Sequence, residues 1–373
     1  MNIEKTAISL TQDLVRIPSE SSNHTESDPK HPENKVNEYL ASFCITRAID
    51  FELQEVTAGR NNFIAYFPKK NAPKLLITAH ADTVSASGMT KAFSGDIADD
   101  KIWGRGACDD KGPLAAALST LAGLQQQNRK LAYDVTFAAT VDEECSMAGA
   151  AALATKLDPW DLCIGLEPTE LTIINAHKGI HRCKISTRGV AAHSSTPDRG
   201  RNAIIEMHAI IADLQVLGLR IKRQHNSVLG EASLAITQIK GGSSVNIIPD
   251  YCQISVDTRL LPEQDPKQYT MQLEQLVGGR GEIKDIFYAG GIETDINHKP
   301  ISRLQNAIAQ CGYNPTPQAA SYATDCSKLI KKGPCLVWGP GSISHAHQND
   351  EHIEITQIKD ACRILQMYLS AEH

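Results

Sequence analysis

The chain of 373 residues is long enough for about two domains, and its 42% hydrophobic and 21% charged residues are typical of a globular protein. The net charge of −6 provides no basic field, which argues against nucleic acid as a partner. No apolar stretch approaches the roughly 20 residues of a membrane helix, and no basic region precedes an apolar core at the N-terminus. We therefore expect a cytoplasmic protein without membrane contact, in which cysteines inside apolar runs (Cys163, Cys183, Cys335) are buried free thiols.

The first 177 residues alternate between predicted strands and helices. The N-terminal segment is amphipathic and is expected to form a helix that stops before Pro18. Short apolar runs predict buried strands at 61–67, 74–80, 134–140 and 161–166. Alanine-rich segments predict helices at 113–127 and 149–157. This order is typical of βαβ units, so we expect an α/β fold with a mainly parallel sheet flanked by helices.

The pattern changes after His177. Alternation of apolar and polar residues predicts half-exposed strands at 181–189, 232–242 and 251–262, and helical periodicity predicts helices at 202–218 and 263–278. This order is typical of a small α+β sandwich, which we expect as an insert at 178–292. The main domain then comprises 1–177 and 293–373, and it ends in an amphipathic helix at 355–370.

Histidines and acidic residues occur where the buried strands of the main domain end. Seven of them are candidates for one site: His80, Asp82, Asp109, Glu143, Glu144, Glu167 and His347. The carboxyl ends of strands in an open α/β sheet are where ligands bind. Imidazole and carboxylate ligands suit zinc, cobalt or manganese better than calcium or magnesium. Taken alone, a His-x-Asp pair is better interpreted as a satisfied core histidine, and an acidic run as a solvated turn.

Five motifs in chain order support the metal interpretation. They are H-A-D-T-V at 80–84, G-R-G-A-C-D-D-K-G at 104–112, D-E-E at 142–144, E-P at 167–168 and A-H-Q-N-D-E at 346–351. The chain thereby resembles the dinuclear zinc amidohydrolases, a family that includes acetylornithine deacetylase, succinyl-diaminopimelate desuccinylase, aminoacylase and glutamate carboxypeptidase. The resemblance covers essentially the whole chain. It implies two divalent metal ions, with zinc preferred and cobalt or manganese as alternatives.

The resemblance also implies how the metal ligands are divided. Asp109 would bridge the two ions. His80 and Glu167 would complete the site of one ion, and Glu144 and His347 the site of the other. These assignments are physically consistent, because a carboxylate has two oxygens and a two-metal site holds its ions roughly 3.5–4 Å apart.

Two further acidic residues are expected to act beside the metals. By resemblance, Glu143 would be the general base, and Asp82 would be the carboxylate that orients His80. A metal-bound histidine commonly donates its second N–H to such a partner. His345 is an alternative to His347 as ligand, although the A-H-Q-N-D-E register favours His347.

The predicted insert carries three more candidates, and the resemblance implies that it is a lid and dimerisation domain. His193 resembles the lid histidine that reaches the active site of the partner subunit in a homodimer and steadies the oxyanion. Its alternative is a turn-capping histidine. Asn246 and Arg259 resemble positions that hold the α-carboxylate of the substrate. The alternative for Arg259 is a local ion pair with Asp257.

The substrate is implied less directly. Thr324 lies in a segment that resembles the loop lining the acyl pocket, although Ala323 stands where many members have glycine. The segment 339–348 is similar to acetylornithine deacetylases, so we expect hydrolysis of a small N-acyl amino acid, preferably N-acetylornithine. Desuccinylase, carboxypeptidase and dipeptidase activities are alternatives on the same core. A non-catalytic binding relative is the alternative from another class, but it would usually have lost a ligand or Glu143.

Overall fold

The computed structural model describes residues 1–21 and 32–371. They form two compact units, the first made of Met1–Asn175, Thr294–Gln318 and Thr324–His373, and the second of Ala176–Glu293 and Ala319–Ala323. The second unit begins and ends within two residues of the predicted insert, but it also includes Ala319–Ala323, which we expected in the main domain. That short segment joins the second unit because its carbonyl oxygens accept hydrogen bonds there: Ala320 O from Lys178 N and Ser321 O from Arg259. No helix in the described ranges is long and apolar enough to cross a membrane.

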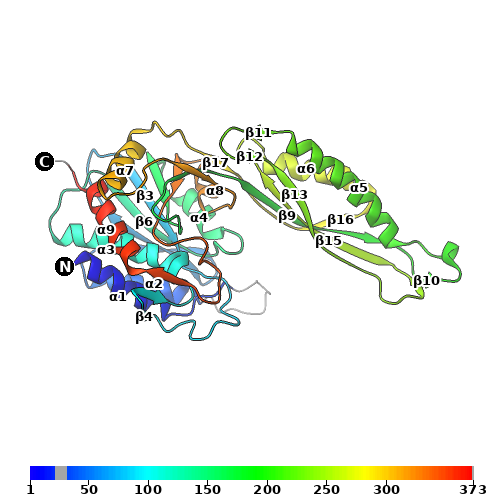
Figure 1. The fold of residues 1–373 in the computed structure, drawn as a ribbon, viewed down its shortest axis with the longest axis horizontal. Coiled ribbons are helices and arrows are strands. Elements are labelled where there is room, and N and C mark those ends of the chain that lie inside the picture. Colours follow the sequence, from blue (N-terminus) through cyan, green and yellow to red (C-terminus); the bar gives the residue numbers. More distant parts are fainter. Residues whose placement is uncertain (22–31, 372–373) are drawn as a thin grey trace. The chain divides into compact units, whose positions relative to one another are not determined.

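One sheet organises the first unit, with its strands in the order β1-β2-β6-β3-β7-β19-β8 (Figure 1). Their bounds are β1 Asp50–Thr57, β2 Arg60–Phe67, β6 Asp134–Thr140, β3 Lys74–His80, β7 Leu162–Gly165, β19 Cys335–Val337 and β8 Ile174–His177. The central strands β6, β3, β7 and β19 run parallel, whereas β1, β2 and β8 are antiparallel to their neighbours. The predicted mainly parallel α/β sheet is confirmed at its centre. Strand β3 is buried from Leu75 to His80, as its continuous apolar run predicts.

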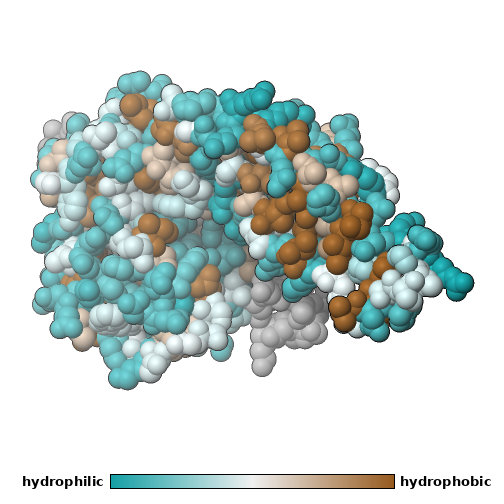
Figure 2. Space-filling view, turned by 45° about the vertical axis from the view of Figure 1, so that its right-hand side comes forward, coloured by the Kyte–Doolittle hydropathy of each residue, from teal (hydrophilic) through white to brown (hydrophobic). Residues whose placement is uncertain are grey.

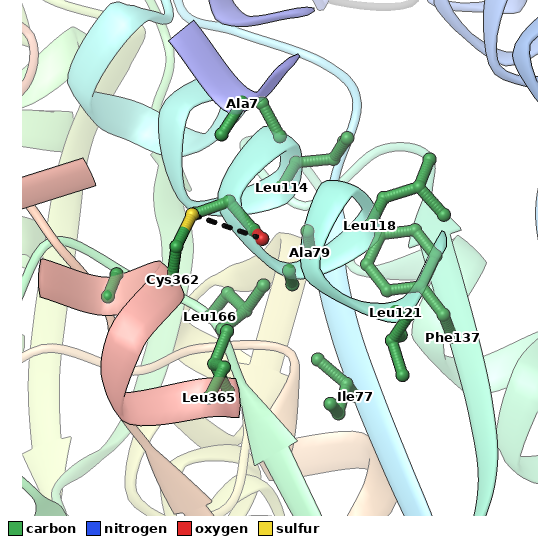
Figure 3. Packing of buried hydrophobic residues seen from close by; sticks show 14 of the residues in the cluster. Ala7, Ile77, Ala79, Leu114, Leu118, Leu121, Phe137, Leu166, Cys362 and Leu365 are labelled. Atoms are coloured by element: carbon green, nitrogen blue, oxygen red, sulfur yellow. Dashed lines mark hydrogen bonds between the residues drawn. The ribbon is translucent and has the colours of Figure 1, made fainter. Parts of the chain in front are cut away.

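Seven helices of the described residues belong to the first unit: α1 Ile3–Val15, α2 Asn34–Ile45, α3 Gly112–Gln126, α4 Ala148–Lys156, α7 Lys299–Gln310, α8 Cys326–Leu329 and α9 Ile355–Leu369. Helix α3 is buried on all sides over its first thirteen residues, which explains its alanine- and leucine-rich sequence. Figure 3 shows side chains of α1, α9, β3 and β6 packed around α3, among them Ala7, Leu365 and Phe137. Burying each large apolar side chain contributes roughly 1.5–3 kcal/mol.

A small sheet lies beside this core, with strands in the order β20-β5-β4. Its strands are β20 His352–Glu354, β5 Lys101–Trp103 and β4 Asp96–Ala98. Strand β20 begins just after the motif at 346–351, and β5 ends just before the motif at 104–112. The pairing of these two strands therefore holds the two motifs together.

The second unit is an α+β sandwich, as predicted. Its antiparallel sheet has the order β13-β15-β9-β16, with bounds β13 Ser233–Gly241, β15 Tyr251–Leu260, β9 Gly179–Arg188 and β16 Glu282–Ala289. Helices α5 Ala203–Lys222 and α6 Pro266–Val277 cover it, and their apolar faces share one core with the sheet. Caps fix both helix starts: the side chain of Asn202 accepts from Ile204 N and Ile205 N, and that of Asp265 from Lys267 N. Four short strands form two small pairs, β10 Ala192–His193 with β14 Ile247–Ile248 and β11 His225–Asn226 with β12 Gly230–Glu231. The short strands β17 Ile292–Glu293 and β18 Gln318–Ala320 both pair with β8 and so extend the large sheet.

Candidate metal centre

Parallel strands bring the predicted ligands to one edge of the sheet. His80 is the last residue of β3, and its neighbours β6 and β7 end at Thr140 and Gly165. Just beyond those ends lie Glu144 and Glu167, and the loop after β19 carries His347. The chain turns sharply at two of these places, because Asp142 and His347 both have positive φ angles, of 69° and 63°.

Asp109 lies between two histidines. Its Oδ1 is 2.8 Å from Nε2 of His80, and its Oδ2 is 3.2 Å from Nε2 of His347. The same nitrogen of His347 lies 3.1 Å from Oε1 of Glu144. The two oxygens of one carboxylate therefore face two separate groups of possible ligands.

The structure contains two overlapping groups that could each hold a metal ion. One consists of His80, Asp109 and Glu167, and the other of Asp109, Glu144 and His347; within each, the ligand atoms lie within 4.8 Å of one another. Metal–ligand distances of about 2.0–2.2 Å for nitrogen and oxygen place the ligands of one ion at such separations. All five residues predicted as metal ligands are thus brought together, and Asp109 belongs to both groups.

The electrostatics of these groups fit cations. Burial raises the pKa of Glu167 well above its usual value, and the charges of Asp109 and Glu143 raise it further. Burial also opposes the charged form of His80, but hydrogen bonds to Asp109 and Asp82 outweigh this effect and raise its pKa. The carboxylates of Glu167, Glu143 and Asp109 thus repel one another within one buried site. Two divalent ions would supply the missing positive charge.

Asp82 lies beside His80 and also contacts the acidic turn. The atom closest to Nδ1 of His80 is the backbone oxygen of Asp82, at 2.9 Å, whereas the carboxylate oxygen Oδ1 is 3.7 Å away. The carboxylate of Asp82 also accepts hydrogen bonds from Glu143 N, at 3.1 Å, and Glu144 N, at 3.2 Å. It holds the turn that presents these two acidic residues, because the sharp bend at Asp142 leaves their amides directed at it.

The ion pair between Arg105 and Glu351 supports the backbone at Asp109, a role that the sequence did not predict. Arg105 NH1 donates to Oε2 of Glu351 at 2.5 Å, and both side chains are almost completely buried. Oε1 of Glu351 accepts from Cys108 N and Asp109 N, each at 3.1 Å. Both residues belong to the quoted motifs, but nothing in the sequence indicated that segments 246 residues apart would form a pair.

Two more buried acidic residues, Asp110 and Asp325, were not predicted as part of the site. Oδ2 of Asp110 accepts from the backbone N of His80 at 3.2 Å, and Oδ2 of Asp325 accepts from the Thr140 hydroxyl at 2.6 Å. Burial raises the pKa of Asp325 to about 7. The signal for Asp110 was its position beside Asp109. Asp325 has no comparable signal beyond its position after Thr324.

His345 is directed elsewhere. Its ring packs on that of His352 with 4.1 Å between centroids, and it belongs to neither metal-ligand group of the described residues.

Thr324 is buried, and its hydroxyl accepts from Cys326 N at the start of α8.

Comparison with known proteins identifies the family. Residues 76–371 match the model of peptidase family M20/M25/M40. The chain belongs to this family. It is 31% identical to an acetylornithine deacetylase of Proteus mirabilis over 96% of this chain and 95% of that protein. The corresponding enzyme of Photorhabdus laumondii is 32% identical, with the same coverage of both chains.

Solved structures agree on the fold. An M20 family metallo-carboxypeptidase from Sulfolobus solfataricus superposes with a TM-score of 0.80 at 19% identity, covering 97% of this chain and 98% of that one. A dinuclear metal-binding M20 peptidase from Bacillus subtilis gives a TM-score of 0.70 at 18% identity, covering 98% and 97%. The protein is therefore a metal-dependent amidohydrolase of the M20 family, as the motifs indicated, and it has a cluster of His, Asp and Glu residues that could hold metal ions.

The remaining candidates lie in the second unit of this M20 protein. His193 is exposed on β10, which pairs with β14, and Asn246 O accepts from Ser194 N at 2.9 Å, so His193 and Asn246 are close together. Nδ1 of His193 accepts from Ser195 N at 3.1 Å, which is the turn-capping contact considered as its alternative. Arg259 donates from Nε to Oδ1 of Asp257 at 3.0 Å, and this is the local ion pair considered as its alternative.

Proposed function

We propose that this M20 amidohydrolase removes the acyl group from an N-acyl amino acid, and that N-acetylornithine is its preferred substrate, giving ornithine and acetate. The observation that carries the reaction is the pair of ligand groups sharing Asp109, with Glu143 next in sequence to the ligand Glu144. The choice of substrate rests on the similarity to acetylornithine deacetylases along 96% of the chain.

We assign His80, Asp109 and Glu167 to one ion and Asp109, Glu144 and His347 to the other. Two divalent ions bound here would lower the pKa of a water and polarise the amide carbonyl. Zinc suits the mixed imidazole and carboxylate set, and cobalt or manganese accept the same ligands.

Glu143 is the proposed general base. Burial raises the pKa of its carboxyl well above the usual value, and the charges of Asp325 and Glu144 add to that effect, so the group has a high affinity for a proton. It takes the proton of the attacking water and delivers it to the leaving nitrogen, so that the amide C–N bond breaks to give an amine and a carboxylate. Asp82 assists by fixing the backbone of Glu143 and Glu144.

We propose that the second unit supplies groups for the substrate. Nδ1 of His193 is in contact with Ser195, which leaves Nε2 as the ring nitrogen to donate to an oxyanion. Arg259 uses Nε for Asp257, and a guanidinium has further N–H groups for a carboxylate. We assign Asn246 to the same carboxylate and the loop at Thr324 to the acyl group.

The same unit is the proposed dimer interface. Large apolar side chains are exposed on it: Val216 and Leu219 of α5 at 66% each, and Ile239 of β13 at 58%. Figure 2 shows apolar residues gathered on this unit. Strand β13 is also at the edge of its sheet, which leaves one side open for pairing. A homodimer through α5 and β13 would cover this surface and allow His193 to serve the active site of a second subunit.

Hydrolysis of a substrate panel tests the proposal. The zinc- or cobalt-loaded protein is assayed with N-acetylornithine, succinyl-diaminopimelate, other N-acyl amino acids and dipeptides. We expect the highest kcat/KM with N-acetylornithine and loss of activity on chelation. A higher value with the succinylated compound or with dipeptides would overturn the substrate assignment but leave the metal chemistry intact. Activity insensitive to chelation would overturn both.

A further inference from the structure

Three cysteines form a second cluster of metal-ligating side chains in the first unit. The sulfur atoms of Cys163, Cys326 and Cys335 lie within 4.8 Å of one another. Cys163 and Cys335 are direct register partners on the parallel strands β7 and β19, and Cys326 begins α8. All three lie outside any disulfide and have no exposed surface. None belongs to the two groups that share Asp109.

The chain makes space for these sulfurs. A Cβ atom added to Gly165 would lie 2.5 Å from Sγ of Cys326, so only glycine leaves room for that sulfur beside β7. The thiols of Cys326 and Cys335 each reach a backbone oxygen, Leu336 O at 3.6 Å and Gly333 O at 3.4 Å. The cluster is therefore positioned by three separate elements.

A second observation points to a ligand. Trp160 is 7% exposed, and its Nε1 has no conventional hydrogen-bond partner among residues 1–21 and 32–371. Burial raises the pKa of Cys335 well above its usual value, as does the thiol of Cys326, but the side chains of Cys163 and Trp160 act in the opposite direction. An N–H group close to a sulfur favours the thiolate, which is the form that binds metal.

We propose that Cys163, Cys326 and Cys335 form a trigonal site for a soft d10 cation, the class that includes Cu(I) and Cd(II). Metal–sulfur bonds of about 2.3 Å place the sulfurs of a three-coordinate site about 4 Å apart, which the cluster allows. The group contains no His, Asp or Glu as a fourth ligand. Tetrahedral zinc is thereby disfavoured, and thiolates alone select soft cations.

Binding has a defined proton balance and a structural effect. Each thiol that forms an S–metal bond releases one proton to water, so full coordination releases three. The ion would join three elements that lie next to acidic or histidine residues of the first unit. Strand β7 precedes Glu167, strand β19 precedes His347, and helix α8 follows Asp325. Because only the folded chain offers the site preassembled, a bound ion stabilises the fold by mass action.

Cadmium-113 NMR of the full-length, reduced protein tests the site. Cd²⁺ is added to wild type and to Cys326→Ser and Cys335→Ser, and Cys44→Ser is the control because Cys44 is a buried thiol outside the cluster. We expect one sulfur-ligated resonance, far downfield of any signal from oxygen and nitrogen ligands, in wild type and the control. We expect none in the two cluster variants, and release of three protons per sulfur-bound ion.

Two results would overturn the site. One is the absence of a sulfur-ligated resonance in folded wild type whose Asp109-sharing centre is already filled. The other is a resonance that persists in both cluster variants. If a serine variant fails to fold, Cys326→Ala replaces it. A rise in Tm on addition of cadmium that occurs in wild type and Cys44→Ser but not in the cluster variants supports the site. Equal rises in all variants contradict it.

Discussion

The residues proposed for chemistry in the first unit and those proposed for substrate binding in the second unit are held in different ways. Asp82 and Asp109 are almost completely buried, and hydrogen bonds join the Asp82 carboxylate to Glu144 N and the Asp109 backbone N to Glu351, tens to hundreds of residues away in sequence. His193 is exposed and bonded to Ser195, two residues away, and the ion pair of Arg259 is with Asp257, also two residues away, although Arg259 donates to Ser321 O as well. We infer that folding alone sets the metal centre. The groups of the second unit reach their working contacts only when a substrate or a second subunit binds.

The largest effect is expected at Glu143. Changing it to Gln removes the base while keeping the size of the side chain, so kcat should fall by about 10²–10⁴-fold. Metal content should be unchanged, because Glu143 belongs to neither ligand group. The exposed Glu38→Gln is the control. A Glu143→Gln enzyme with the parent rate would refute the base assignment.

The next largest effect concerns stability of the first unit. Arg105→Ala leaves the buried charge of Glu351 unpaired and should lower the free energy of unfolding by about 3–5 kcal/mol. Urea unfolding measures the loss, and the exposed Arg129→Ala is the matched control. Equal midpoints for the two variants would show that this pair does not anchor the Asp109 segment.

In the second unit, His193→Ala should lower kcat by about 10²–10³-fold, the usual effect of removing an oxyanion donor. Its stability should change little, because the side chain is exposed. If His193 serves the other subunit, mixing the inactive Glu143→Gln and His193→Ala proteins should regain activity that neither has alone. A fully active monomer would contradict the partner-subunit role.

A smaller, pH-dependent effect is expected from His181 in the second unit. Burial lowers its pKa from 6.5 to about 4, and its Nε2 is 2.9 Å from the Thr270 hydroxyl. As the pH falls below 6.5, the unfolded chain takes up a proton that the folded chain refuses, so stability declines until about pH 4. His181→Phe should flatten this part of the stability profile, with the exposed His208→Gln as control. An unchanged slope in His181→Phe would contradict the assignment.

The sequence predicted the parts of the fold that depend on strong periodic patterns. The apolar runs that became β3, β6 and β7 and the alanine-rich α3 were placed within one or two residues. Helices α2 and α7 and strands β1 and β16 were missed. Strand β1 alternates exposed and half-buried residues, and β16 is an edge strand with few buried positions, so their apolar signals are weak.

The candidate site was predictable where it depends on strand ends. His80, Glu144 and Glu167 meet because parallel strands finish at the same edge. The contact of Asp82 with the amides of the acidic turn depends on a left-handed bend at Asp142, which no residue type indicates. The pairing of Arg105 with Glu351 requires tertiary structure for the same reason.

Metal stoichiometry tests the central claim most directly. Protein saturated with zinc and then dialysed against metal-free buffer is analysed by elemental mass spectrometry, beside Glu167→Gln and Asp109→Ala. Because two ligand groups share Asp109, we predict two centre-bound ions per wild-type chain, fewer in Glu167→Gln and the fewest in Asp109→Ala. Cys326→Ser in the background of each variant removes any contribution of the thiol cluster. A folded Asp109→Ala protein that retains two centre-bound ions would contradict the shared-carboxylate centre.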